Sequence, residues 1–335
     1  MKTTLRVVPA TMVRPGSTNY GTAKYPMTAK SRIFTTAAVL LAGGLALTGC
    51  TTASQGSGTG PTSTAGTFDV STVTKDNALA AQVPAAIRAK GTLTVGADTS
   101  YAPAEFLGGA DGQTPMGYDV QLAQAIGNML GLKTTVQTAE FPTILPSLGA
   151  KYDLGVSSFF ITAERRKAAN FVSYVAAGTQ WAVQKGNPKK FSLEGICGKT
   201  VAVQTGTFQE SPDISTRNKA CTDTGKPAIK VVSLKNQTDV TTRVINGSAD
   251  AMAAGSITVG YAITQSKDAI QTLGPQYGAS PVGIAVALDD MPLAKVTAAA
   301  MNKLIANGDY KKILDQWGVG SVAIPKAEVN PATSK

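Results

Sequence analysis

The sequence has no histidine among its 335 residues, and this absence excludes more chemistry than any other feature. Without an imidazole, Ser-His-Asp hydrolysis and histidine-ligated zinc sites are impossible. Only three cysteines are present, and a cysteine nucleophile would have no histidine to activate it. Charged residues make up 16% of the chain and aromatic residues 6%, whereas 43% of the chain is apolar, which excludes a disordered protein. The length corresponds to about two domains.

Positive charge is concentrated at the N-terminus. The formal net charge of +10 would by itself suggest a nucleic-acid or membrane partner. Six basic residues lie within the first 49 positions, which hold no Asp or Glu, so the charge falls to +4 if that segment is removed. We therefore expect no nucleic-acid partner. The six residues are Lys2, Arg6, Arg14, Lys24, Lys30 and Arg32.

Residues 1–49 have the order of an export signal, with basic residues before an apolar run at 33–47. That run is shorter than the about 20 residues that a permanent spanning helix needs. The sequence LTGC that ends at Cys50 looks like the lipobox of bacterial lipoproteins, in which the cysteine is joined to diacylglycerol and becomes the N-terminus. We expect translation to start at Met27 and a lipid on Cys50 to anchor the exported protein to the outer face of the cytoplasmic membrane. A buried or free Cys50 is the alternative.

A stretch of low complexity follows the lipobox. Residues 51–67 contain only Thr, Ala, Ser, Gln, Gly and Pro, which cannot bury enough apolar surface to fold. We expect residues 50–82 to be the lipidated cysteine and a flexible linker, and the folded body to begin near Val83. Because export leads to an oxidising compartment, Cys197 and Cys221 are expected to form a disulfide.

Apolar periodicity predicts strands that alternate with helices, as in a mostly parallel sheet. Residues 92–95 form a predicted strand, and residues 118–130 place one apolar face along a helix, with Asp119 as a possible N-cap and Gly131 beyond its end. Further strands are predicted at 133–138, 153–156, 199–203 and 249–253, and further helices at 142–148, from 163, at 237–246, at 293–305 and at 310–317.

Two segments indicate an internal repeat. Residues 147–153 and 244–250 each combine a helix end, a turn and an Asp that leads into a strand. Chance similarity between common turn residues is the alternative. Two similar lobes would hold a ligand between them, at the carboxyl ends of their strands.

Short motifs occur in a characteristic order: 91–98 (GTLTVGAD), 101–103 (YAP), 116–120 (MGYDV), 152–154 (YDL), 161–165 (ITAER), 203–207 (VQTGT), 282–286 (VGIAV) and 307–313 (NGDYKKI). In this order they resemble the family 3 extracellular solute-binding proteins of amino-acid-type ABC importers, over about residues 83–319. The paired cysteines look like one branch of that family.

The resemblance implies an α/β fold of the two-lobed type II periplasmic-binding-protein class, with each lobe a mostly parallel sheet flanked by helices. It also implies that a small carboxylate-bearing solute is captured between the lobes and delivered to ABC permease subunits, by a monomer that needs no cofactor. The implied boundaries are 84–184 and 284–325 for lobe 1, 185–283 for lobe 2, 326–335 for a tail, and a two-strand hinge near 182–185 and 283–286.

Arg165 is the first candidate site residue. It falls in the first turn of a predicted helix capped by Thr162, where the helix dipole disfavours a cation. In the family the matching arginine binds the ligand carboxylate, for which a guanidinium fork is suited. A solvated arginine is the alternative. Gly206 and Thr207 follow a strand and open a helix, so their N–H groups are expected to meet the same carboxylate unless they form an ordinary turn.

The resemblance implies further contacts with the ligand. Ser157 and Ser158 match positions that bond its amino or carboxylate group, or else they cap the strand end. Asp98 matches a residue that could pair with a cationic group, and Tyr101 one that could cover it. Two aromatic residues fall at wall positions or in the core, namely Phe141 and Phe208.

Two positions depart from the family pattern. Phe160 stands where a Ser or Thr hydroxyl is common, and Gly255 stands where an Asp commonly binds the α-ammonium. The first change makes the pocket more apolar and the second removes a charge partner. Both argue against an ordinary α-amino acid as the ligand.

Binding for transport is expected rather than catalysis. A dehydratase of cyclic prephenate-like acids shares this fold, but the lipid tether and the missing histidine argue against that use. A lytic transglycosylase would need an extra catalytic domain. A solute-sensing or adhesive surface protein is the remaining alternative.

Overall fold

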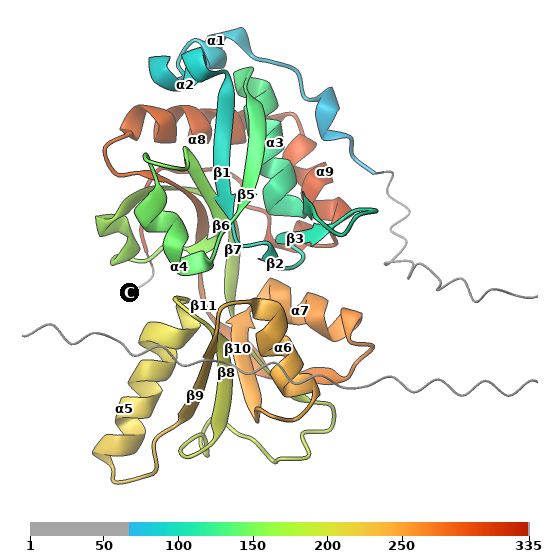
Figure 1. Cartoon of the computed structure of the whole chain (residues 1–335), viewed down its shortest axis with the longest axis vertical. Coiled ribbons are helices and arrows are strands. Elements are labelled where there is room, and N and C mark those ends of the chain that lie inside the picture. The colour runs from blue at the N-terminus through green and yellow to red at the C-terminus, as the bar shows by residue number, and fades with distance from the viewer. Residues whose placement is uncertain (1–66, 334–335) are drawn as a thin grey trace, which may run out of the picture. The chain divides into compact units, whose positions relative to one another are not determined.

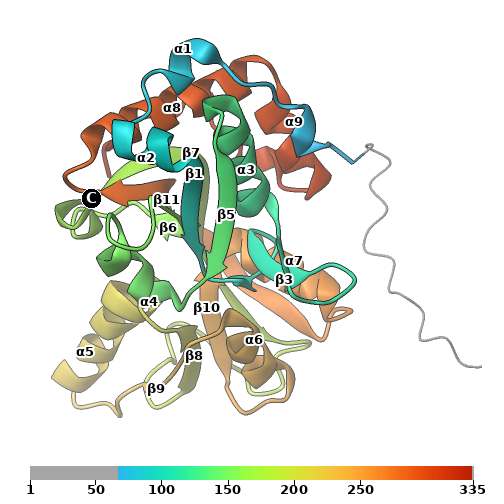
Figure 2. The same cartoon turned by 45° about the horizontal axis from the view of Figure 1, so that its top comes forward.

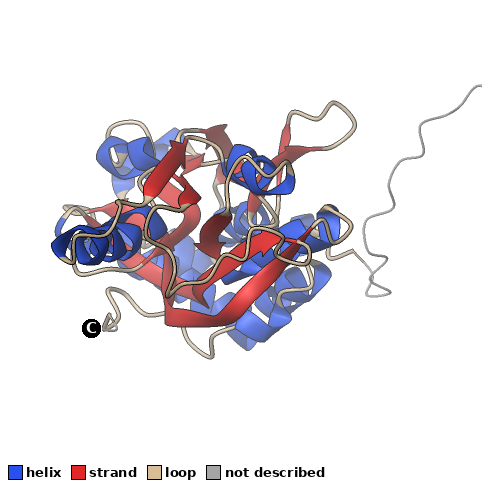
Figure 3. Ribbon diagram, turned by 90° about the horizontal axis from the view of Figure 1, so that it is seen from below, coloured by secondary structure: helices blue, strands red, loops and turns tan. Residues whose placement is uncertain are grey.

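The computed structural model describes residues 67–333, so the export signal and Cys50 lie outside the described residues. One sheet of eight strands runs through the molecule in the order β5-β1-β6-β11-β7-β10-β8-β9 (Figure 1). Helices lie on both sides of these strands (Figure 3). A separate small sheet has the order β2-β3-β4. Between residues 67 and 333, we find no helix that combines the length and the apolar character needed to cross a membrane.

Lobe 1 is built from the N-terminal elements and the last helices. Its strands are β1 (Thr92–Ala97), β2 (Ser100–Tyr101), β3 (Glu105–Gly108), β4 (Thr114–Met116), β5 (Lys133–Thr138) and β6 (Leu154–Phe160). Its helices are α1 (Asn77–Ala80), α2 (Ala85–Lys90), α3 (Tyr118–Leu130), α4 (Phe141–Ile144), α8 (Met291–Ala306) and α9 (Asp309–Gln316). Short 3₁₀ turns lie at Val70–Thr72, Leu145–Ser147, Arg165–Lys167 and Gly320–Val322.

Lobe 2 comprises β8 (Thr200–Gln204), α5 (Ser215–Asp223), β9 (Lys230–Leu234), α6 (Gln237–Ile245), β10 (Ala251–Gly255) and α7 (Ser256–Gln265). A distorted helical turn at Gln209–Ile214 leads into α5. The parallel pairing of β8 with both β9 and β10 matches the predicted alternation. The expected two-lobed α/β fold is therefore confirmed.

Helix α3 shows how the sequence pattern becomes structure. Its apolar residues are buried against the sheet, and Gly131 ends the helix at a φ of 70°, as predicted. Asp119 is not the N-cap, because Gly117 holds that position at a φ of 121°. A Cβ on Gly117 would lie 2.1 Å from the carbonyl oxygen of Ala104, so only glycine fits this close approach. Asp119 does not cap the helix and lies buried in its first turn.

The predicted repeat has a structural counterpart in each lobe. Asp153, before β6, accepts a hydrogen bond from the N–H of Thr94 on β1 at 2.6 Å. Asp250, before β10, accepts one from the N–H of Thr200 on β8 at 2.7 Å. Each aspartate also pairs with a lysine. An aspartate at the equivalent position therefore fixes the register of the corresponding strands in each lobe.

Two long antiparallel strands, β7 (Ala169–Gln184) and β11 (Ile270–Ala287), run through both lobes (Figure 1). Ala177 packs in the core of lobe 1, whereas Trp181 packs in that of lobe 2. The return crossing on β11 lies between Tyr277 and Val282, where the register with β7 shifts. The hinge position expected at 182–185 and 283–286 is therefore wrong. The first segment already packs in lobe 2, and the second already packs in lobe 1.

The folded body extends further in both directions than expected. Helix α1 packs against α3 and lies across α8 (Figure 2), and Val73 is buried, so the linker ends before residue 82. At the other end Val329 pairs with Val172 on β7, and Ala327 is buried. The segment expected as a tail from residue 326 is part of lobe 1 because it covers the edge of the core.

The expected disulfide is present between Cys197 and Cys221, whose Cα atoms are 5.6 Å apart. It joins the loop before β8 to α5 and lies beside the core of lobe 2. The bond therefore closes a loop within lobe 2 alone.

Candidate functional site

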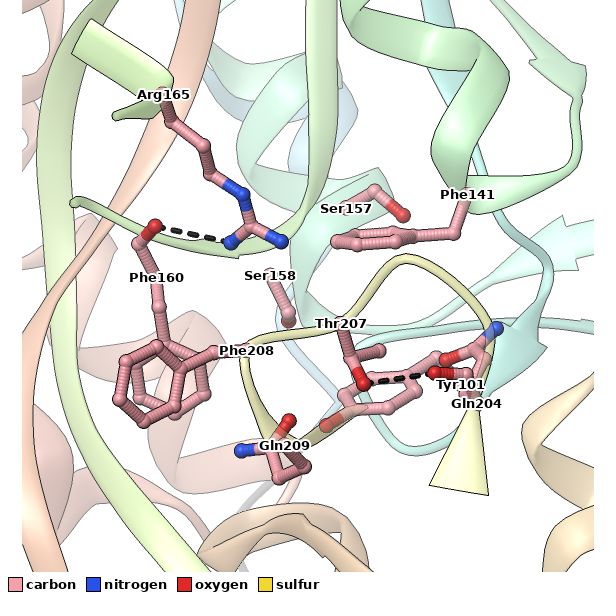
Figure 4. Close-up of a pocket in the computed structure, with 10 residues that line it drawn as sticks. All are labelled: Tyr101, Phe141, Ser157, Ser158, Phe160, Arg165, Gln204, Thr207, Phe208 and Gln209. Carbon is pink, nitrogen blue, oxygen red and sulfur yellow. Dashed lines mark hydrogen bonds between the residues drawn. The ribbon is translucent and has the colours of Figure 1, made fainter. Parts of the chain in front are cut away.

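A cavity between the lobes collects most of the residues expected at the site (Figure 4). Lobe 1 supplies Tyr101, Phe141, Ser157, Ser158, Phe160 and Arg165, and lobe 2 supplies Gln204, Thr207, Phe208 and Gln209. Gly255 lines a second cavity that shares Tyr101, Ser158 and Phe160 with the first. Asp98 lines neither cavity.

Arg165 presents a partly buried guanidinium to this cavity. It donates hydrogen bonds to the carbonyl oxygens of Phe160 and Gly206, each at 3.0 Å, and so spans both lobes. The ring of Phe141 lies 5.3 Å from the guanidinium carbon. No Asp or Glu side chain of residues 67–333 pairs with it, and burial lowers the pKa of Arg165 to about 10. A partly buried cation without an acidic partner favours an anionic ligand.

The local structure around Arg165 differs from the expectation. Thr162 does accept a hydrogen bond from the N–H of Arg165, at 3.1 Å. The predicted helix from residue 163, however, is a three-residue 3₁₀ turn. The conflict with a helix dipole is therefore absent, because so short a turn has little dipole. The reason to expect an anion is instead that this partly buried guanidinium has no acidic partner among residues 67–333.

The Gly206 turn is already occupied by the chain itself. The N–H of Gly206 donates to the Glu210 carboxylate at 2.6 Å, and the N–H of Thr207 points to the carbonyl of Gln204 at 3.4 Å. In this arrangement both N–H groups are therefore bonded within the chain, as in the alternative of an ordinary turn. The turn does hold a carboxylate, because Gly206 adopts a φ of 77° that directs its N–H toward Glu210.

The hydroxyls of Ser157 and Ser158 lie at the cavity wall and donate to two buried acids. Ser157 Oγ donates to Glu105 at 2.8 Å, and Ser158 donates its N–H and Oγ–H to Asp119 at 3.0 and 3.2 Å. Ser158 is held at a φ of 48°, which is unusual for a residue other than glycine. Both serine oxygens can therefore accept a hydrogen bond from a ligand but have little left to donate.

The two acids behind the serines were missed as a pair by the sequence reasoning. Glu105 and Asp119 are fully buried, and one oxygen of each has no hydrogen-bond donor. Tyr174 donates to Asp119 at 2.8 Å. Burial raises the pKa of both carboxyls, and the neighbouring Asp119 raises that of Glu105 further. The two groups are satisfied together when one of them carries a proton.

Asp98 does not face the ligand cavity, contrary to the expectation that it could pair with a cationic group. Its carboxylate accepts from the N–H and Oγ–H of Ser100, from the N–H of Phe141 and from Gln204 Nε2. These four donors use the acceptor positions of a carboxylate. Burial nevertheless raises the pKa of Asp98. The residue acts as a strand-end anchor whose bond to Gln204, at 2.7 Å, joins the two lobes.

Tyr101 accounts for the glycine at 255. The N–H of Gly255 donates to Tyr101 Oη at 2.9 Å, and a Cβ on Gly255 would lie 2.7 Å from that oxygen. The hydroxyl therefore occupies the position that a Cβ at 255 would approach. Burial raises the pKa of Tyr101 to about 12, so the group stays neutral. A side chain at position 255 would therefore require the Tyr101 hydroxyl to move.

Two glutamines at the cavity were not predicted. Gln204 reaches across to Asp98, and Gln209 is buried and donates to Thr179 Oγ1 at 2.9 Å. Both flank the predicted Gly206–Thr207 turn, and that position is the signal that could have identified them. Phe208, also at this turn, packs against Phe160 with ring centres 6.0 Å apart. Within residues 67–333, no group of three or more Asp, Glu, Cys or His side chains could hold a metal ion.

Comparison with protein families and known proteins now gives this geometry a context. Residues 93–320 match the bacterial extracellular solute-binding proteins, family 3. The arginine-binding protein ArgT of Corynebacterium glutamicum is 36% identical over 251 residues, which cover 75% of this chain and 82% of that protein.

Solved structures give the same picture. An ancestral arginine-binding protein bound to arginine superposes with a TM-score of 0.61 at 29% identity, over 68% of this chain and 98% of that one. An ancestral amino acid-binding protein, described as a precursor of cyclohexadienyl dehydratase, gives a TM-score of 0.60 at 29% identity, over 69% of this chain and 97% of that one. The similarity covers both lobes.

Proposed function

We propose, from the premise that this chain belongs to the bacterial extracellular solute-binding proteins of family 3, that Arg165 captures the carboxylate of its ligand between the two lobes. The chain is a substrate-binding protein of the amino-acid ABC transporter type. Like its relatives, which are named as binding proteins, it is not an enzyme. Membership of an extracellular family makes it an exported protein.

The observation that carries the proposal is the unpaired guanidinium of Arg165. Its contacts come from Phe160 in lobe 1 and Gly206 in lobe 2, so a ligand bound to it would touch both lobes. A carboxylate there would supply the missing negative charge and would favour closure of the lobes. The proposed ligand is a small carboxylate-bearing amino acid or a close analogue. L-Arginine is the first compound to test, because several relatives are named as arginine-binding proteins.

The remaining steps of the proposal concern the cell surface. A lipid on Cys50 would tether the protein to the outer face of the membrane, close to the permease subunits that receive the ligand. One monomer would carry one ligand to them, because the cavity is formed within a single chain.

Calorimetry on Arg165 variants tests the proposal. We expect Arg165→Ala to weaken ligand binding by about 30-fold to several thousand-fold, the effect of removing one partner of a desolvated ion pair. Arg165→Lys is expected to bind weakly too, because a point charge cannot replace the fork. Arg166→Ala is the matched control, since Arg166 bonds instead to the carbonyl of Pro331 outside the cavity. Equal affinity in wild type and both Arg165 variants would refute the proposal.

A further inference from the structure

Two carboxyl groups lie directly behind the wall of the first cavity. Glu105 on β3 and Asp119 on α3 have no exposed surface. Glu105 Oε2 and Asp119 Oδ1 receive no hydrogen bond from any donor in the described part of the chain. Within residues 67–333, neither acid forms an ion pair with a lysine or arginine. Two neighbouring buried charges without a cation are costly, so one shared proton, which bonds the two carboxyls to each other, satisfies the pair.

Each acid also holds one of the two serines of the cavity wall. Ser157 Oγ donates to Glu105 at 2.8 Å, and Ser158 donates its N–H and Oγ–H to Asp119 at 3.0 and 3.2 Å. Tyr174 donates to the same Asp119 oxygen at 2.8 Å. Ser158 adopts a φ of 48°, which a residue other than glycine keeps only where its contacts fix it. Asp119 therefore positions Ser158 at the cavity (Figure 4).

Ser157 connects the acid pair to a bond that joins the lobes. Its Oγ accepts a hydrogen bond from the N–H of Asp98 at 3.0 Å. The Asp98 carboxylate accepts one from Gln204 of lobe 2 at 2.7 Å. A continuous series of contacts therefore runs from Glu105 through Ser157 and Asp98 to the other lobe. A displacement of the Ser157 hydroxyl would disturb closure of the lobes as well as the cavity wall.

A second negative charge on the pair would have little compensation from its surroundings. On the cavity side the cation is Arg165, whose guanidinium already bonds to the carbonyls of Phe160 and Gly206. Closure of the lobes removes water from the cavity, so the desolvation cost of a second charge is larger in the closed form than in the open form. The titratable side chains packed around the two acids are themselves acids, namely Asp98, Tyr101, Tyr118 and Tyr174.

We propose that Glu105 and Asp119 are positioning residues of the ligand site, and that the proton they share couples lobe closure and ligand binding to pH. With the proton in place, the pair holds both serines and permits closure. When the proton passes to solvent, the two carboxylates repel each other, the serines are displaced and the open form is favoured. The part of this inference that concerns binding rests on the function proposed above, whereas the part that concerns closure does not.

Variants of Glu105 separate the effect of its charge from that of its shape. In Glu105→Gln, the amide NH₂ can replace the shared proton as the donor to Asp119 and the carbonyl can accept from Ser157, but the side chain does not titrate. Glu105→Leu has a similar size and supplies neither group. Glu194→Gln is the matched control, because it makes the same change at an exposed position of lobe 2. Thermal unfolding of each variant shows whether it is folded.

Scattering and calorimetry then measure closure and binding separately. Small-angle scattering follows closure without any ligand, and calorimetry uses L-arginine, both at several pH values between 4.5 and 10.0, the ordinary pKa values of a glutamic acid and a tyrosine. In wild type and Glu194→Gln, we expect the radius of gyration to increase with pH. The affinity should fall by up to about tenfold per pH unit, the limit for uptake of one proton.

The Glu105 variants should depart from this profile in different ways. Glu105→Gln should keep the affinity that wild type has at low pH and lose its pH dependence. Titration of L-arginine itself is the same for every protein and cancels in the comparison. Glu105→Leu should bind about tenfold or more weakly at every pH, because Ser157 loses its acceptor and Asp119 its donor.

The outcomes distinguish this inference from the proposed function. The inference is wrong if wild type and Glu105→Gln have the same pH profiles in both measurements, or if Glu105→Leu binds as tightly as Glu105→Gln. In either case the proposed function stands as long as Arg165→Ala abolishes binding. If binding does not depend on Arg165, the proposed function fails. A radius of gyration that depends on pH in wild type but not in Glu105→Gln would still support closure coupled to the shared proton.

Discussion

Gln204 offers a direct test of what holds the lobes together. Its Nε2 donates to Asp98 at 2.7 Å and to the carbonyl of Lys235 at 3.0 Å, and the first of these bonds crosses between lobes. Four other bonds that cross nearby are those from Arg165 to the carbonyl of Gly206, from the N–H of Gly255 to Tyr101, from the N–H of Gln237 to Ser100 Oγ and from Lys235 to Glu140. The substitution Gln204→Leu removes the donor to Asp98 while keeping a side chain of similar size.

The expected magnitude follows from the charge of the acceptor. A hydrogen bond to an ionised group contributes about 1.5 to 3 kcal/mol, so its loss should shift the equilibrium between closed and open lobes by about 10- to 150-fold toward open. A ligand that requires the closed form would lose affinity by up to the same factor.

Small-angle scattering of the ligand-free protein measures this shift apart from ligand contacts. The radius of gyration should increase for Gln204→Leu and stay at the wild-type value for Gln184→Leu, the control, whose hydrogen bond to the carbonyl of Ile245 lies within lobe 2. An unchanged radius together with unchanged ligand affinity would refute the view that the Asp98–Gln204 bond stabilises closure.

Three further predictions concern other parts of the chain. Replacing Cys197 and Cys221 by Ser should lower the free energy of unfolding by about 3 kcal/mol, from the loop that the bond closes, and a loss below about 1 kcal/mol in urea denaturation would contradict that estimate. The pKa of Glu105 is raised in the native protein, so its carboxyl keeps a proton that the unfolded chain releases. The free energy of unfolding should therefore fall as the pH rises above 4.5, the ordinary pKa of this side chain. Glu105→Gln should flatten that fall in thermal unfolding at several pH values, whereas the exposed Glu164→Gln should leave it unchanged. Cys50→Ser should release the protein into the medium, and retention in the membrane fraction would count against lipidation.

Much of the fold was accessible from the sequence because its elements follow local patterns. The period of apolar residues defined α3 within its observed bounds, and the stretch 133–138 coincides with β5. The repeat at 147–153 and 244–250 reflects a shared contact, since Asp153 and Asp250 both fix neighbouring strands. These features depend on residues close in sequence.

The hinge and the cross-lobe bonds could not be predicted in the same way. β7 is buried on both faces along most of its length, so no alternation marks where it passes from one lobe to the other. The bond from Gln204 to Asp98 joins residues 106 positions apart, and no local pattern specifies it. Eight predicted residues do line the first cavity, but Asp98 lies away from it because its own strand end requires all its acceptors.

The passage of β7 and β11 through both lobes also has a consequence for how the protein is assembled. Lobe 2 is one continuous stretch of chain inserted between neighbouring strands of lobe 1, whereas the core of lobe 1 needs β11, α8 and α9 from the C-terminal part. As the chain emerges on the far side of the membrane, lobe 2 can complete its folding while the early strands of lobe 1 still await their partners. The carbonyls that hold Arg165 come from both lobes, so the binding site is completed only after both lobes have folded.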